Sequence, residues 1–211
     1  MSRSPSLYIV DYGSGNLRSV QKAFEHVGVD AAVGSDPRAM ADAAGLVLPG
    51  VGAFGAAMEQ LEEKDLIGPL LDRIEAGVPF LGVCLGLQLL FESSEEDPGV
   101  RGLGSVRGDV RALPPTVKVP HIGWNQVETC TCSDLMDGIP DGSAFYFVHG
   151  YAVVPRSPRD VLAVTDYDGV TFVSAVEVDN MAAVQFHPEK SSALGLHLYR
   201  NFARRAGLTA V

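Results

Sequence analysis

The first half of the chain alternates short continuous hydrophobic runs with stretches in which hydrophobic residues recur every three or four positions. The continuous runs predict strands at 7–10, 45–48 and 78–83. The periodic stretches predict helices over 17–27, through Met58 and Leu61, over 66–74, and from Leu85 to Phe91. Buried strands that alternate with helices favour a mostly parallel central sheet with helices on both faces.

The pattern changes after about residue 100. Short strands separated by Gly, Pro, Asn or Asp are predicted around 105–112, 117–128, 143–149, 161–166, 170–178 and 181–186. Asp179-Asn180 fits a hairpin turn between the last two. Ser191 or Ser192 is the predicted cap of a final helix, which would bury Leu194, Leu198 and Phe202. We therefore expect an α/β fold with additional antiparallel strands in its second half, and one domain over 1–211.

Composition and charge narrow the function. The 211 residues are 46% hydrophobic and 20% charged, with a formal net charge of -10. This charge would repel nucleic acid and anionic membranes, so neither is an expected partner. Residues 1–6 contain no apolar signal core, and the longest apolar run, 78–91, is too short to span a bilayer. The chain is expected to be soluble and cytoplasmic.

Three cysteines stand at 84, 130 and 132, too few for a disulfide framework. Cys130 and Cys132 lack a second pair and a nearby histidine, so we expect no metal site and treat both as loop or strand-edge residues. Cys84 differs because it lies in Gly82-Val-Cys-Leu-Gly86, between a predicted strand and a predicted helix.

The G-x-nucleophile-x-G form at Cys84 is typical of a nucleophile elbow. Small flanking residues allow strand and helix to approach, and the helix N-terminus favours a thiolate. The alternative is a buried small hydrophobic residue in a glycine-rich turn, which is how most unpaired cysteines behave.

A base and its orienting group are predicted at Gln185-Phe-His187-Pro-Glu189. Proline keeps His187 extended, and residues i and i+2 of an extended segment point the same way, so Glu189 can support the imidazole. Cys84, His187 and Glu189 would then form a catalytic triad. On its own, the segment is better explained as a strand-end His beside a turn proline with an exposed Glu; the elbow cysteine is what favours the triad. His149 is the second candidate for the base, although no carboxylate lies near it in the sequence.

Backbone donors for an oxyanion are predicted in Pro49-Gly-Val-Gly52. Such a loop can aim an N–H at a developing negative charge, with the Leu85 N–H as the second donor. Its other interpretation is a plain glycine turn.

Longer motifs resemble the class I (triad) glutamine amidotransferases. The class-level segments are GVCLGLQ at 82–88 and FHPE at 186–189. A narrower resemblance, to the glutaminase subunits of imidazole glycerol phosphate synthases, rests on DYGSGNLRSV at 11–20, LPGVGAF at 48–54, PHIGWN at 120–125, YFVHGY at 146–151 and FHPEKSS at 186–192. The resemblance implies a flavodoxin-like fold.

The resemblance also implies roles for individual residues. Cys84, His187 and Glu189 would be catalytic, and Val51, Gly52 and Leu85 would form the oxyanion hole. The substrate L-glutamine would be bound by Gln88, Glu96, Gly150 and Tyr151. The side toward a partner would carry Tyr146, Lys190, His121, Trp124 and Asn125. Gly150 departs from the hydroxyl residue expected there, which puts a side-chain contact in doubt.

The implied reaction is hydrolysis of glutamine to glutamate and ammonia without metal or organic cofactor. The implied partner is a (β/α)8-barrel cyclase, in a heterodimer that makes imidazole glycerol phosphate in histidine biosynthesis. We expect the isolated chain to be nearly inactive, because the oxyanion loop needs the partner to point an N–H inward.

Three alternatives are open from the sequence. The chain could serve anthranilate, carbamoyl phosphate or pyridoxal phosphate synthesis instead. The elbow also suits a cysteine peptidase or another thiol hydrolase. A non-catalytic interaction subunit is the third, and it predicts that Cys84→Ala leaves glutamine-dependent activity of the complex intact.

Overall fold

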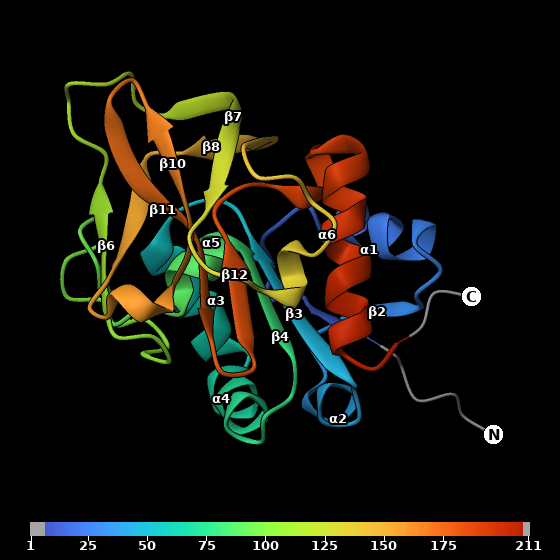
Figure 1. The fold of residues 1–211 in the computed structure, drawn as a ribbon. Helices are drawn as coiled ribbons and strands as arrows, with labels where there is room; N and C mark the ends of the chain where they lie inside the picture. The colour runs from blue at the N-terminus through green and yellow to red at the C-terminus, as the bar shows by residue number, and fades with distance from the viewer. Residues whose placement is uncertain (1–6, 209–211) are drawn as a thin grey trace.

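A parallel sheet lies in the middle of the computed structural model, as the alternating pattern predicts (Figure 1). Its strands run in the order β2-β1-β3-β4-β12. Their bounds are β1 Leu7–Val10, β2 Ala31–Gly34, β3 Gly45–Gly50, β4 Phe80–Cys84 and β12 Met181–Val184. The strand from the end of the chain therefore lies directly beside β4, pairing Val184 with Val83.

The structure describes residues 7–208. Residues 1–6, for which the sequence predicts no signal core, lie outside the described part. No helix within 7–208 has both the length and the apolar character needed to cross a membrane.

Helices cover both faces of the parallel strands (Figure 1). One face carries α1 (Leu17–His26) and α6 (Ser192–Arg205). The other carries α2 (Pro37–Ala41), α3 (Phe54–Glu63), α4 (Ile67–Glu75) and α5 (Leu85–Leu89). Successive strand side chains point to opposite faces, so each strand supplies both cores. In β4, for example, Leu81 and Val83 pack toward α6, whereas Phe80 belongs to the opposite cluster.

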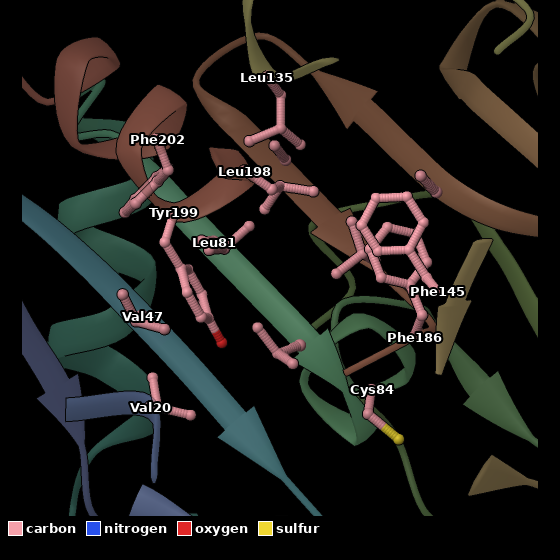
Figure 2. Packing of buried hydrophobic residues seen from close by; sticks show 14 of the residues in the cluster. Val20, Val47, Leu81, Cys84, Leu135, Phe145, Phe186, Leu198, Tyr199 and Phe202 are labelled. Atoms are coloured by element: carbon pink, nitrogen blue, oxygen red, sulfur yellow. The ribbon is translucent and has the colours of Figure 1, made fainter. Parts of the chain in front are cut away.

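The core on the α6 face reaches the carboxyl end of β4. Figure 2 shows Leu198, Tyr199 and Phe202 of α6 over the strands, with Cys84 at the margin of the cluster. Phe145 and Phe186 stack beside it, with ring centroids 4.2 Å apart. This packing holds the segment after β12 against the end of β4.

Antiparallel strands extend the sheet beyond β12, as the second half of the sequence predicts. They follow in the order β11 (Val170–Val178), β10 (Val161–Tyr167), β7 (His121–Thr129) and β8 (Ser143–His149). A side branch pairs β9 (Tyr151–Pro155) with β11 and with β6 (Gly108–Ala112), which pairs in turn with β5 (Ser93–Ser94). Single 3-10 turns lie at η1 (Asp134–Met136), η2 (Pro158–Asp160) and η3 (Pro188–Lys190).

Several elements differ from the sequence prediction. β3, which the sequence predicts to end at residue 48, continues to Gly50, because Pro49 and Gly50 pair with Val83 and Cys84 of β4. β2, α2 and β9 were not predicted: the first two are very short, and β9 follows β8 after Gly150 alone. Asp179-Asn180 does connect β11 to β12, with Asp179 at a φ of 52°.

Candidate active site

Cys84 ends β4 in a strained conformation. Its φ of 55° and ψ of -109° are unusual for a residue with a side chain. The flanking glycines are required by close approach: a Cβ on Gly86 would lie 1.8 Å from the Leu48 carbonyl oxygen, and one on Gly82 2.8 Å from the Gly86 oxygen. The sequence therefore forces a tight strand-to-helix turn, with α5 beginning at Leu85 and the thiol at its N-terminus.

His187 reaches the same edge of the sheet because β12 is the parallel neighbour of β4. The strand ends at Val184, and the chain continues through Phe186 in the apolar cluster. His187 itself is extended, with φ -103° and ψ 96°, and its N–H donates to the Tyr146 carbonyl at 2.8 Å. Ser191, at the N-cap of α6, does not cap the helix with its side chain; its hydroxyl donates to the His187 carbonyl at 2.7 Å.

Glu189 contacts the imidazole through a different geometry from the one predicted. Its Oε1 lies 2.8 Å from His187 Nδ1, and both side chains are 2% exposed. The segment is not extended, however, because Pro188–Lys190 form a 3-10 turn. The Tyr199 hydroxyl donates to the other carboxylate oxygen at 3.3 Å, so both oxygens of Glu189 are held.

The charges around His187 favour its protonated form. Burial lowers the pKa of the imidazole, but its interactions with Cys84 and Glu189 outweigh burial and raise the pKa to about 9. Among the described residues no hydrogen bond of ordinary geometry reaches Nε2, which is buried. Nδ1 is held by Glu189, so Nε2 is the atom that remains for proton transfer with Cys84 or a ligand.

A cavity of about 160 Å³ opens beside Cys84. It brings together the oxyanion and substrate residues inferred from the sequence: Val51, Gly52, Leu85, Gln88, Glu96, Gly150 and Tyr151. Val148 and His149 complete the lining. A larger hollow of about 860 Å³ beside α3 and α4 is lined by neither cysteine nor histidine.

Two of the lining segments are tied down by neighbouring residues. The Ser14 hydroxyl donates to the Val51 carbonyl, which joins the oxyanion loop to the turn after β1. Glu96 Oε2 accepts the Phe54 N–H at 2.8 Å, at the start of α3. The carboxylate of Glu96 therefore lines the cavity from a fixed position.

A chain of buried hydrogen bonds runs behind the cavity. The Gln88 amide nitrogen lies 3.1 Å from the Tyr151 carbonyl oxygen and 3.1 Å from Gln185 Oε1. Gln185 Nε2 lies 3.7 Å from the Cys84 sulfur. Both N–H groups of Gln88 are thus engaged, so its carbonyl oxygen is the group it can offer to a ligand.

His149, the second candidate for the base, contributes to the same chain. Its Nδ1 lies 2.8 Å from the Tyr151 carbonyl oxygen, and its Nε2 lies 3.1 Å from His121 Nδ1. Burial lowers the pKa of His149 to about 4, so the ring is neutral at pH 7. A neutral ring whose Nδ1 must donate to a carbonyl is oriented by backbone, not by a carboxylate.

The residues inferred to face a partner fall into two groups. Trp124 is 53% exposed, its ring lies 6.2 Å from that of Tyr146, and Lys190 Nζ lies 5.8 Å from the Tyr146 ring. Asn125 is half-buried and donates to the Asp166 carbonyl. His121 does not belong to the exposed surface: it is 3% exposed, because Tyr167 and Phe147 stack on its ring.

Gln185 and Tyr199 have no assigned role in the sequence prediction, whereas Ile122 lies in the segment inferred to face a partner and Ser191 is a predicted helix cap. Ile122 is 60% exposed beside Trp124, and Gln185, Tyr199 and Ser191 contact the triad or its backbone. Gln185 carries a signal that could have been used, since it is a lone polar residue within the apolar run of 181–186. Tyr199 carries none, because its contact with Glu189 comes from packing of α6.

Comparison with known proteins agrees with this geometry. Residues 8–206 match the family described as glutamine amidotransferase class-I. "Imidazole glycerol phosphate synthase subunit HisH" of Aquifex aeolicus is 54% identical over 199 residues, covering 94% of this chain and 96% of the relative. The protein of the same name from Methanothermobacter thermautotrophicus is 53% identical over 196 residues, 92% of this chain and 96% of the relative.

A solved structure supports the fold. PurLQS from Thermotoga maritima gives a TM-score of 0.74 at 18% identity, over 97% of this chain and 98% of that one. The α/β fold class and the resemblance drawn from the motifs are both confirmed.

Proposed function

Because the chain belongs to the class-I glutamine amidotransferase family, we propose that it is the glutaminase subunit of an imidazole glycerol phosphate synthase. It acts in the cytoplasm, hydrolyses L-glutamine and passes ammonia to a (β/α)8-barrel cyclase. The observation that carries this proposal is the interaction of Cys84, at the elbow after β4, with His187 after β12, whose Nδ1 in turn contacts Glu189. The extent of identity with the HisH proteins supports the choice of pathway.

The proposed reaction has two steps, acylation of Cys84 and hydrolysis of the acyl-enzyme. The Cys84 thiolate attacks the carboxamide carbon of glutamine, and backbone N–H groups of the Val51–Gly52 loop and Leu85 stabilise the oxyanion. The His187 imidazolium donates its Nε2 proton to the departing ammonia, which leaves a γ-glutamyl thioester on Cys84. Neutral His187 then takes a proton from water, the resulting hydroxide attacks the thioester, and glutamate is released.

Glutamine fits the groups that line the cavity. The carbonyl oxygen of Gln88 and the carboxylate of Glu96 are both acceptors, so they suit the N–H groups of a small amino-acid amide. A volume of about 160 Å³ is small for a peptide chain, which disfavours the peptidase alternative.

The exposed surface formed by β7 and the neighbouring residues Tyr146 and Lys190 suits a protein partner. Ile122 and Trp124 of β7 are exposed hydrophobic residues, and Tyr146 and Lys190 adjoin them. An exposed apolar group with aromatic members is typical of a protein interface. We assign this surface to the cyclase subunit.

The deciding experiment mixes the chain with its cyclase and compares glutamine-driven with ammonia-driven synthesis of imidazole glycerol phosphate. Cys84→Ala should abolish the glutamine-driven rate and leave the ammonia-driven rate unchanged. Persistence of the glutamine-driven rate would favour a non-catalytic subunit. Activity with another amide-dependent synthase, and none with the cyclase, would favour another branch of the family.

The isolated chain should turn over glutamine at a small fraction of the rate of the complex. Rapid turnover by the purified chain alone would contradict the dependence of the oxyanion loop on the partner.

A further inference from the structure

Gln185 has no role in the reaction described above, although its side chain lies beside the nucleophile. It is fully buried at 0% exposure, and its amide nitrogen lies 3.7 Å from the Cys84 sulfur. A buried amide costs free energy unless its polar atoms are bonded. Both of its amide atoms have partners, so the hydrogen-bond pattern decides what the amide does.

The Tyr151 carbonyl oxygen determines which way the two buried amides point. A carbonyl oxygen only accepts, so the end of Gln88 that faces it must be the NH₂ group. The other N–H of that group points at the Gln185 side chain, which must therefore present its oxygen. The reverse orientation of either amide would oppose two acceptors or two donors.

The consequence is that Gln185 directs its NH₂ group at the sulfur. The position of the Tyr151 carbonyl is itself secured by a second donor, His149 Nδ1, at 2.8 Å. A neutral thiol is a weak acceptor, whereas a thiolate accepts an N–H as a charge-assisted bond. The donor thus discriminates between the two protonation states of Cys84.

One neighbour of the sulfur favours the opposite state. The Val148 carbonyl oxygen lies 3.8 Å away, and a neutral thiol would donate its proton there. Gln185 and His187 both favour the thiolate. The fully buried Tyr12 lies close enough to Cys84 to interact with its charge. Burial and that charge both raise the pKa of Tyr12, so its hydroxyl is neutral.

We infer that Gln185 stabilises the thiolate of Cys84 through its side-chain amide, whose orientation is fixed by Gln88 and the Tyr151 carbonyl. Gln185 is thus a positioning residue for the nucleophile in addition to the triad. The part that Gln185 plays in glutamine hydrolysis rests on the proposed function. Its effect on the protonation of Cys84 does not, because that effect can be measured without glutamine.

The test measures alkylation of Cys84 by iodoacetamide as a function of pH, without glutamine. The starting protein is the full chain with Cys130→Ser and Cys132→Ser, since these two cysteines are exposed and would also react. Gln185→Met keeps the size of the side chain and removes the donor. Alkylation at pH 6 to 7 should fall about tenfold, and the pH profile should move upward.

Two further variants separate this effect from a structural one. Gln88→Met releases the orientation of Gln185 and should lower alkylation about two- to threefold, a smaller loss than Gln185→Met causes. Asn201→Leu removes another buried amide, which bonds the Leu135 and Asp137 carbonyls away from the sulfur. It should lower the thermal unfolding temperature and leave the alkylation profile unchanged.

A folded Gln185→Met protein with an unchanged alkylation profile would overturn the inference. If that variant does not fold, Gln185→Asn, whose shorter amide cannot reach both partners, takes its place with the same criterion. In the complex with the cyclase, Gln185→Met should lower kcat for glutamine about tenfold and change KM less than threefold. An altered profile without any glutamine-driven synthesis by the unsubstituted complex would preserve the inference and refute the proposed function.

Discussion

At the scale of single residues, the protonation of His187 defines the working range of the enzyme. The raised pKa keeps the imidazole protonated at pH values well above 6.5, the ordinary pKa of histidine, and the proposed first step uses that proton. The imidazolium therefore persists at neutral pH and is lost as the pH rises through about 9.

We expect kcat/KM for glutamine in the complex to fall as the pH rises through about 9, the pKa of His187. Glu189→Gln removes one of the interactions that raise this pKa, so the alkaline limb should move about one pH unit lower. Rate profiles between pH 6 and 10.5 test this. An alkaline limb that stays in place in Glu189→Gln would contradict the assigned role of Glu189.

The proximity of Cys84, His187 and Glu189 could be predicted from residue types and spacing, because the three residues lie in short motifs with distinct local geometry. The left-handed φ of Cys84 follows from the glycines on either side. The supporting bonds from Tyr199 and Ser191 could not be predicted, since they depend on how α6 packs. The burial of His121 could not be predicted, because alternation along β7 does not reveal which face is covered by other aromatic rings.

At the scale of elements, α6 and the η3 turn fix the triad segment by close packing. Gly195 of α6 lies against Pro188, and a Cβ there would be 1.8 Å from the Pro188 carbonyl oxygen. Either α6 or the turn that carries Glu189 would have to move to accept a side chain.

Gly195→Ala should lower the free energy of unfolding by about 2 kcal/mol and reduce glutamine turnover, because the strain falls on the turn after His187. Gly68→Ala is the matched control: it lies in α4 with open space around the added methyl, and it should stabilise the protein by up to about 1 kcal/mol. Urea denaturation and activity of the complex provide both readouts. If Gly195→Ala changed neither the free energy of unfolding nor the activity, the turn at Pro188–Lys190 would be able to move without cost.

Three of the parallel strands, β1, β3 and β4, could be predicted because buried parallel strands read as continuous apolar runs. Elements without such runs were missed. β2 is four residues long with three of them half-buried, and β9 is separated from β8 by Gly150 alone, so no turn signal marks its start. The strand order, which places β12 beside β4, is a long-range property that no local pattern encodes.

At the scale of the whole molecule, a buried neutral histidine links stability to pH. The folded-state pKa of His149 is about 4, below the ordinary value of 6.5. As the pH falls from 6.5 toward 4, the unfolded chain binds a proton that the folded protein excludes, so stability is lost in that window. His187 acts in the opposite sense, and its contribution is lost as the pH rises from 6.5 through about 9.

His149→Gln should therefore reduce the acid-induced loss of stability by up to about 3 kcal/mol between pH 6.5 and 4. Denaturant unfolding at several pH values measures it. His26→Gln, at an exposed position of α1, is the matched control. If the free energy of unfolding fell equally between pH 6.5 and 4 in the His149→Gln and unsubstituted proteins, the imidazole of His149 would not be buried in its neutral form.

The proposed partner surface makes a separate prediction. Trp124→Ala should weaken binding of the cyclase about tenfold or more, because a large aromatic side chain is a frequent energetic centre of an interface. Val154→Ala, an exposed hydrophobic residue on β9, should leave the affinity unchanged. Calorimetric titration with the cyclase compares the two, and equal effects would argue against this surface.

The pairing of β4 with β12 has a consequence for protein synthesis. The ribosome makes the strand that bears the thiol long before the strand that leads to the imidazole, yet the two are neighbours in the finished sheet. A nascent chain that has not reached β12 holds a cysteine without its base. On the proposed mechanism, such an incomplete polypeptide lacks the proton donor that releases ammonia.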